Sequence, residues 1–168
     1  MEFLEHAIAW CKGEIFEGRL ILLFGIIVVV SAFLFYKMGE TPSAKAMLYP
    51  LLVAGILFVG IGGIMSYSNP KRIVEFETAY AENPKAFIQS EKERVEGFQY
   101  MYTVTLVIAT LSFTFAMLVF WLSNSPALKA VAIAVAIFGI SGLVIDYFSE
   151  ERAAIYYEKI IETIDNQE

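Results

Sequence analysis

Four long runs without a charged residue constrain this chain more than any other feature. They cover residues 20–36, 46–70, 97–128 and 130–145. A helix that crosses the hydrocarbon core of a bilayer needs about 20 apolar residues, with about 17 as the lower limit. Three runs meet this limit, and the fourth meets it if Lys129 extends its ammonium group toward the headgroups. We therefore predict four transmembrane helices, at about residues 20–36, 46–67, 100–122 and 127–146.

The composition fits a membrane protein better than a soluble domain. Hydrophobic residues make up 58% of the chain and charged residues 18%, and the mean hydropathy is +0.62. Residues 21–30 and 131–145 are almost free of polar side chains, whereas a helix on a soluble domain keeps a polar face. The predicted fold class is an all-α integral membrane protein, with residues 1–168 forming a single membrane domain of four transmembrane helices in two tandem hairpins.

The first apolar run does not have the features of a removed signal peptide. Glu2, Glu5, Glu14 and Glu17 precede it in place of a basic segment, and no small-residue cleavage site follows it. The single Cys11 excludes an internal disulfide, and we interpret it as a small buried apolar side chain.

Amphipathic segments surround the spans and predict a small layer of helices outside the bilayer, at about residues 2–12, 70–82, 84–99 and 147–165. The first of these should lie along the membrane surface or against the other polar helices. The last should continue the fourth span in one helix of about 40 residues. We expect one bundle core from the apolar side chains of this layer: Ile73, Phe76, Tyr80, Phe87, Ile88, Val95, Tyr157, Ile160 and Ile164.

Proline and cap residues predict where the helices end. Thr41 and Ser125 are expected N-caps before Pro42 and Pro126. Pro50 should kink the second span or mark its true start. The Asn-Pro pairs at 69–70 and 83–84 are each expected to break or cap a helix, and the helix from residue 84 should run unbroken into the third span.

Small and hydroxylated residues indicate the packed faces of the spans. The second span carries a flank of glycines that a neighbouring helix can approach closely: Gly55, Gly60, Gly62 and Gly63. Ala132, Ala136, Gly139 and Gly142 form a narrow face on the fourth span. We expect a third face, on the third span, to pack inward because of its hydroxyl groups: Thr103, Thr110 and Thr114.

Three short motifs occur twice in the same order and indicate an internal repeat. Glu-x-x-Glu-Gly stands at 14–18 and 93–97, and [Thr/Ser]-Pro-x-x-Lys-Ala stands at 41–46 and 125–130. Tyr-x4-Arg joins Tyr67 to Arg72 and Tyr147 to Arg152. The alternative is that every hairpin needs caps and interfacial tyrosines. A true duplication would relate the hairpins by an axis along the membrane normal.

Loop charges predict the orientation. Only Lys37, Lys45 and Lys129 lie on the side of the two outer turns, so nine of the 12 Lys and Arg residues lie on the other side. The positive-inside rule then places both termini and residues 68–99 in the cytoplasm, in a bacterial inner membrane. Seventeen of the 18 acidic residues lie there too, which gives that side a net charge of −8. Such a surface disfavours nucleic acid and anionic lipid as ligands and suits a basic partner.

A few ionisable residues are candidates for a polar network or an ion path. Asp146 falls at the inner end of the fourth span, where it should handle an ion, pair with Arg72, Arg94 or Arg152, or lie in headgroup water. Tyr67 and Tyr147 belong to the inner aromatic belt. Two carboxylate pairs share a helix face and are weak candidates for a metal site: Glu14 with Glu17, and Glu93 with Glu96. No catalytic set, phosphate loop or cofactor motif is present, so we expect no cofactor.

Three functions remain open at this point. The sequence favours a non-enzymatic interaction protein that acts through an acidic cytoplasmic helical surface. Immunity proteins against membrane-active toxins and accessory subunits of larger complexes share this size and topology. The alternative is a homo-oligomeric small channel or transporter that uses Asp146 and the face formed by Thr103, Thr110 and Thr114. A carboxylate-based metal-binding membrane protein is third. The expected partners are the lipid bilayer and either a protein or further copies of the chain.

Overall fold

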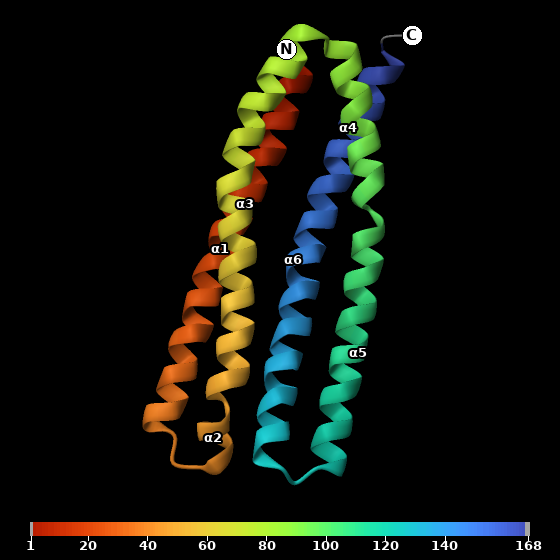
Figure 1. The fold of residues 1–168 in the computed structure, drawn as a ribbon. Helices are drawn as coiled ribbons and strands as arrows, with labels where there is room; N and C mark the ends of the chain where they lie inside the picture. Colours follow the sequence, from red (N-terminus) through yellow and green to blue (C-terminus); the bar gives the residue numbers. More distant parts are fainter. Residues whose placement is uncertain (1, 167–168) are drawn as a thin grey trace.

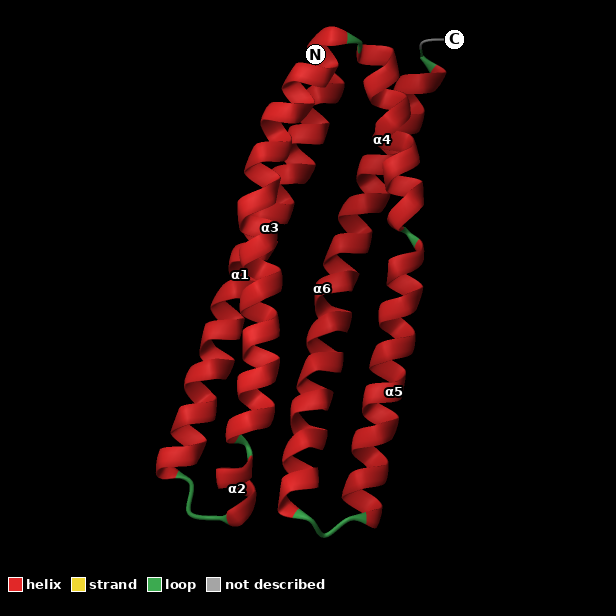
Figure 2. Ribbon diagram, in the orientation of Figure 1, coloured by secondary structure: helices red, strands yellow, loops and turns green. Residues whose placement is uncertain are grey.

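The computed structural model describes residues 2–166, which fold into helices and connecting turns without a strand (Figures 1 and 2). The helices are α1 (Glu2–Met38), α2 (Pro42–Ala46), α3 (Leu48–Glu82), α4 (Pro84–Phe98), α5 (Tyr100–Leu122) and α6 (Pro126–Asp165). Four helical stretches are long and apolar enough to cross a membrane: Glu2–Met38, Pro42–Glu82, Pro84–Leu122 and Pro126–Asp165. The all-α class and the four apolar helices are therefore confirmed.

The long helices run side by side along one axis. α1 packs along α3, α5 packs along α6, and α6 also contacts α1 and α3 (Figure 1). The start of α1, the turn between α3 and α4, and the last turns of α6 lie at one end. The connection through α2 and the turn between α5 and α6 lie at the other end. α6 is thus the helix that joins the two pairs.

The predicted N-caps are confirmed at the turns between apolar helices. The side chain of Thr41 accepts a hydrogen bond from the amide of Ala44, and Ser125 accepts one from Leu128. Pro50 lies in the first turn of α3, and the chain breaks at Met47 between α2 and α3. This break suits Pro50, because proline has no N–H to donate to the carbonyl four residues earlier.

Two helix boundaries differ from the prediction. The expected end at Asn69-Pro70 is wrong, because α3 continues through Pro70 to Glu82. The amide group of Asn69 donates to the carbonyl of Met65 at 3.0 Å, which supports the backbone where the proline removes a donor. The unbroken helix from residue 84 is also wrong, because a turn at Gln99 separates α4 from α5. Asn83 does end α3, and its side chain caps α4.

Glycines allow α1 and α3 to approach closely. A Cβ atom on Gly62 would lie 2.4 Å from the backbone nitrogen of Leu22 and 2.5 Å from the carbonyl oxygen of Gly18. A Cβ atom on Gly55 would lie 3.0 Å from the carbonyl oxygen of Gly25. The predicted close approach is confirmed for Gly55 and Gly62. It is wrong for Gly60 and Gly63, whose Cβ positions have no neighbour within 4 Å.

α5 packs on α6 through small residues and not through its threonines. Ala109, Ser112, Ala116 and Val119 are buried on α5, and Ser112 contacts the Cβ position of Gly139 at 3.0 Å. The expectation that the threonine face packs inward is wrong, because its members are exposed: Thr103, Thr110 and Thr114. The hydroxyls of Thr110 and Thr114 donate to carbonyls of their own helix at 2.8 Å, so they need no partner from another helix.

The polar parts of α1, α3, α4 and α6 pack together at one end of the molecule. We call residues 2–17, 69–98 and 147–165 the polar layer. Its core joins the start of α1, which continues into the first span without a break, to the other three helices: Phe3, Ala7, Trp10, Cys11, Phe76, Phe87, Ile88, Val95, Tyr156 and Ile160. Ile73, Tyr80, Tyr157 and Ile164 pack against this core. The predicted apolar side chains therefore do meet.

Candidate functional site

An ion pair with a buried carboxylate lies at the centre of the polar layer. Glu91 is 3% exposed, and both its oxygens accept hydrogen bonds from Arg94, at 2.8 and 2.7 Å. The hydroxyl of Tyr156 on α6 donates to Glu91 at 2.8 Å. The guanidinium of Arg94 lies 4.3 Å from the centroid of the Trp10 ring on α1. This network connects α1, α4 and α6 through charged and aromatic groups.

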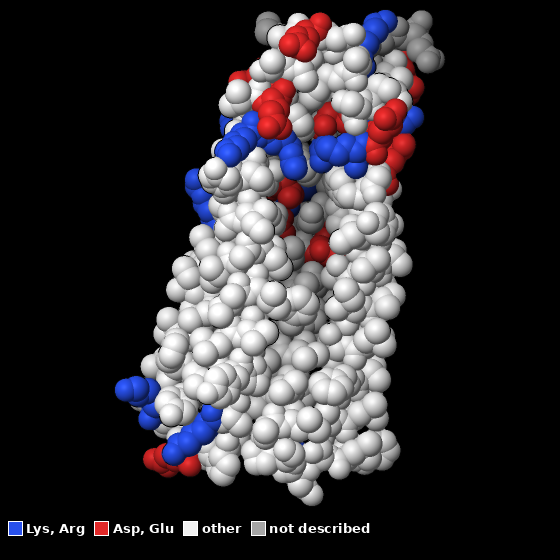
Figure 3. All heavy atoms as spheres, in the orientation of Figure 1, with Lys and Arg blue, Asp and Glu red and all other residues white. Residues whose placement is uncertain are grey.

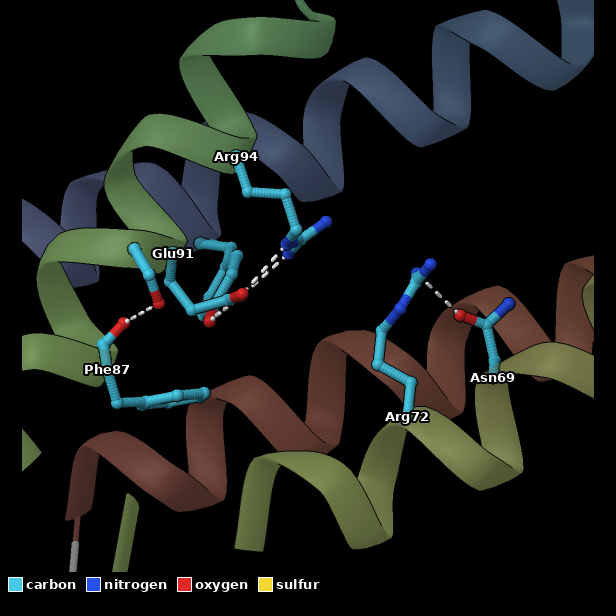
Figure 4. Close-up of polar contacts among 7 residues, drawn as sticks. Asn69, Arg72, Phe87, Glu91 and Arg94 are labelled. Atoms are coloured by element: carbon cyan, nitrogen blue, oxygen red, sulfur yellow. Dashed lines mark hydrogen bonds and ion pairs between the residues drawn. The ribbon is translucent and has the colours of Figure 1, made fainter. Parts of the chain in front are cut away.

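Arg72 extends from α3 toward the same region. It donates to the side-chain oxygen of Asn69 at 3.0 Å, and its guanidinium lies 5.8 Å from the Trp10 ring centroid. Figure 4 shows Arg94 facing Glu91 along α4 and Arg72 turned toward Asn69 along α3. Two guanidinium groups therefore flank one tryptophan in a layer whose overall charge is negative.

Burial and neighbouring charges shift the pKa values of three groups in this region. Burial alone would lower the pKa of Arg94, but its bonds to Glu91 outweigh this effect and raise the pKa. Burial and the charge of Glu91 raise the pKa of Tyr156. Burial, opposed by Arg72 and Arg94, raises the pKa of the Cys11 thiol to about 11. Cys11 is therefore a neutral thiol at neutral pH and a poor nucleophile.

A second charged cluster lies where the polar layer meets the apolar helices. Arg152 on α6 donates to Glu14 at 2.9 Å and also bonds to Glu17, both on α1. The two carboxylates are buried, at 9% and 7% exposure. One guanidinium thus links two carboxylates and leaves the trio with a net charge of −1.

Several polar atoms near this cluster are buried without a hydrogen-bond partner. They include Oε1 of Glu17, Nε of Arg152, Oδ2 of Asp146, and the hydroxyl oxygens of Ser66 and Tyr102. Asp146 belongs to none of the ion pairs found among residues 2–166, so of its expected environments the pairing with Arg72, Arg94 or Arg152 is not observed. Unpaired buried polar atoms are rare in proteins, and several at one level of the molecule mark a place for water or a ligand.

A groove runs from this cluster along the apolar helices. It has a volume of about 950 Å³ and lies between α1 and α6, with Glu17 and Arg152 at one end and Phe35 toward the other. A smaller cavity of about 490 Å³ lies between α3 and α6 and is lined by apolar residues together with Tyr49. Figure 3 shows charges gathered at the polar layer, acidic atoms recessed between the helices just below it, and a long uncharged surface beyond.

The other candidate residues lie apart from these clusters. Tyr67 and Tyr147 are exposed, and the hydroxyl of Tyr67 accepts a hydrogen bond from Lys71 at 2.8 Å. Glu93 accepts from Gln89 at 3.3 Å, and Glu96 accepts from Tyr157 at 2.6 Å. Within residues 2–166 no three His, Cys, Asp or Glu side chains gather as metal ligands would. The guanidinium of Arg152 bonds to both Glu14 and Glu17, so it occupies the place that a metal ion held by this pair would need.

The sequence analysis missed the role of Glu91. Phe87, Glu91 and Val95 repeat every four residues and are all buried, so they share one face of α4. A single carboxylate within such a stripe, followed three residues later by Arg94, was the available signal. The same signal occurs on α1, where Glu14 and Glu17 continue the buried series of Ala7, Trp10 and Ile21 and so are not on a solvated face.

No protein-family model, curated protein or solved structure matches this chain, so its function has to be inferred from its own side chains.

Proposed function

We propose that this chain is a non-enzymatic inner-membrane protein that binds a basic protein partner through the acidic surface of its polar layer. An immunity-like protein or an accessory subunit of a larger complex would act in this way. The packing of the polar layer carries the proposal. Its apolar core and the bonds of Glu91 to Arg94 and Tyr156 hold four helices together, so the surface around them is preorganised for binding.

The charge of that surface supports a basic partner. Twelve acidic side chains are exposed there: Glu2, Glu5, Glu75, Glu77, Glu82, Glu93, Glu96, Glu150, Glu151, Glu158, Glu162 and Asp165. Only three basic residues of the polar layer are equally exposed: Lys12, Lys71 and Lys85. A charge imbalance of this kind accelerates association with a partner of opposite sign and suppresses binding to anionic surfaces.

The proposed orientation follows the positive-inside rule. Spans at about residues 20–36, 46–67, 100–122 and 127–146 cross the membrane as two hairpins, and the polar layer with both termini faces the cytoplasm. The extension of α1, α3 and α6 beyond their apolar segments is consistent with such a layer, because each helix is about twice as long as a span requires.

A photo-crosslinking experiment in the native host tests the proposed function. A photoreactive residue at exposed position 154 of α6 should give one protein adduct of basic isoelectric point. The adduct should weaken several-fold when Glu151, Glu158 and Asp165 are neutralised together, because these carboxylates are exposed on the same helix. A matched variant that changes three exposed neutral residues should keep the adduct: Thr78, Ala81 and Gln89. Lipid adducts alone, or equal yields from both variants, would reject the proposal.

Deletion of residues 155–168 is a less specific test than these substitutions. The deletion removes Tyr156 and Ile160 from the core of the polar layer, where they are 3% and 0% exposed. Loss of function after this deletion would therefore report the loss of the core as well as the loss of acidic surface.

A homo-oligomeric channel or transporter is the second candidate. The unpartnered Oδ2 atom of Asp146 and the exposed face of Thr103, Thr110 and Thr114 favour it, because a second copy could use both. Purified protein in liposomes should then conduct a monovalent cation, and Asp146→Asn should reduce the flux at least tenfold. Flux that is absent, or unchanged in Asp146→Asn, would eliminate this candidate.

A further inference from the structure

The groove between α1 and α6 has the length of a membrane leaflet or more. Its α1 lining extends from Glu17 to Phe35, which is about 27 Å at a rise of about 1.5 Å per residue. Its lining is apolar except for Glu17, Arg152, Ser31 and Ser141. Ser31 donates its hydroxyl to a carbonyl of its own helix at 2.8 Å. The groove therefore offers an apolar path with a charged group only at the end next to the polar layer.

The size and lining of the groove suit an acyl chain. The groove holds about 950 Å³, within the range of roughly 300–1,000 Å³ that is usual for small-molecule sites. An acyl chain is thin, flexible and apolar, so it can lie along this lining while its polar headgroup stays at the charged end.

The charged end of the groove has one unused acceptor and one unused donor. Glu17 is 7% exposed, and its Oε1 atom is buried without a partner although the carboxylate bonds to Arg152. The Nε atom of Arg152 is also buried without a partner. A ligand that both donates and accepts would satisfy the two atoms together. Because Glu14, Glu17 and Arg152 sum to −1, a cationic donor is favoured over an anion.

From these observations we infer that the groove binds a phospholipid with a primary ammonium headgroup. Its acyl chain lies along the apolar lining, its ammonium donates to Oε1 of Glu17, and one of its phosphate or ester oxygens accepts from Nε of Arg152. A choline headgroup has no N–H to donate, and a glycerol headgroup leaves the lipid with a net negative charge. The site therefore selects phosphatidylethanolamine, and this selection does not depend on the protein partner proposed above.

Native mass spectrometry of the full chain in detergent tests the headgroup selection. The probes are phosphatidylethanolamine, phosphatidylcholine and phosphatidylglycerol with identical acyl chains. The wild type should bind the first about tenfold more tightly than the other two, which is the effect of about one charge-assisted hydrogen bond. Glu17→Gln should bring the three affinities within about twofold of one another. The matched control Glu93→Gln, an exposed carboxylate on α4, should keep the tenfold preference.

A second variant tests the groove itself. Ser141→Phe places a large side chain in the lining and should remove one tightly retained lipid, whatever its headgroup. Thr110→Phe, on the exposed face of α5, should leave lipid retention unchanged. If Glu17→Gln loses the helical content of the wild type by circular dichroism, the wild-type preference among the three lipids tests the headgroup selection and Ser141→Phe tests the groove. Equal wild-type affinity for the three lipids, an unchanged preference in folded Glu17→Gln, or unchanged retention in Ser141→Phe would overturn the inference.

Discussion

Glu91 shows how a charge is accommodated inside the polar layer. Its two oxygens receive three hydrogen bonds, two from Arg94 and one from Tyr156. Moving a carboxylate out of water costs several kcal/mol. Deleting one partner of a fully buried ion pair typically lowers the free energy of unfolding by about 3–5 kcal/mol. The pair is therefore stable only while the network is complete, and it makes the packing of α4 against α6 specific.

Loss of this carboxylate should destabilise the protein strongly. Glu91→Ala leaves the partly buried guanidinium of Arg94 without its counter-ion and the buried hydroxyl of Tyr156 without its acceptor, and we expect a loss of about 3 kcal/mol in the free energy of unfolding. Thermal or denaturant unfolding in detergent, followed by tryptophan fluorescence, measures the change. Glu93→Ala, two positions away and exposed, should change stability by less than about 0.5 kcal/mol. Equal losses in the two variants would contradict a structural role for the buried pair.

At the scale of the elements, four glycines determine how α1 and α3 pair. Gly18 faces Gly62, and Gly25 faces Gly55, so each helix presents two glycines seven residues apart. This spacing keeps the glycines on one seam of each helix. Helices in a membrane gain packing energy mainly where small residues let their backbones approach, because lipid is as apolar as the side chains. The seam therefore determines the register of this helix pair.

Alanine substitutions distinguish the seam from the other glycines. Gly62→Ala places a methyl group 2.4 Å from the backbone of α1, and we expect a loss of about 1–3 kcal/mol from the separation of the helices. Gly60→Ala meets nothing within 4 Å and should be neutral or stabilise the helix by up to about 1 kcal/mol. Unfolding in mixed detergent measures both variants. A Gly62→Ala protein as stable as the wild type would contradict the close approach.

The residues of the repeated motifs lie in different environments in the two halves. Pro42 and Pro126 are each the first residue of a helix and directly follow its N-cap residue. Gly18 packs against Met65, whereas Gly97 has nothing within 4 Å of its Cβ position. Glu14 and Glu17 are buried, whereas Glu93 and Glu96 are exposed. The internal repeat stays a prediction, and its motif residues do not share one packing role.

At the scale of the whole molecule, the charges divide the chain into a polar layer and a long uncharged body. Figure 3 shows a few charges at the far turns and the rest at the polar layer. Within residues 2–166, α5 packs extensively only against α6, so much of its surface is exposed. The positive-inside rule then gives an orientation that can be tested.

Cysteine labelling tests the orientation. In a Cys11→Ala background, a cysteine at position 40 or 124 should react with an impermeant maleimide added outside intact cells. A cysteine at position 82 should react only after the membrane is opened, because the turn between α3 and α4 lies at the opposite end of the molecule from the other two positions (Figure 1). Reaction at position 82 from the outside would reverse or refute the proposed topology.

The sequence alone determined the features that depend on local chemistry. Uninterrupted apolar runs predicted four membrane-length helices, and Thr41 and Ser125 predicted the caps, because capping involves residues only three positions apart. The apolar stripes of the polar helices identified the members of one core, because leaving apolar side chains of that size exposed to water costs free energy. Pro70 was misjudged because proline propensity is a local tendency, and the packing of α3 overrides it.

The tertiary structure alone decided which polar residues meet. Glu14 and Glu17 bond to Arg152 across 138 and 135 positions of sequence, and Glu91 meets Tyr156 across 65. The threonines of α5 face outward because the smaller Ala109, Ser112 and Ala116 fit closer to α6. Such contacts depend on how helices are rotated and how closely they approach. Those quantities come from the fit of whole faces, which no single stretch of sequence contains.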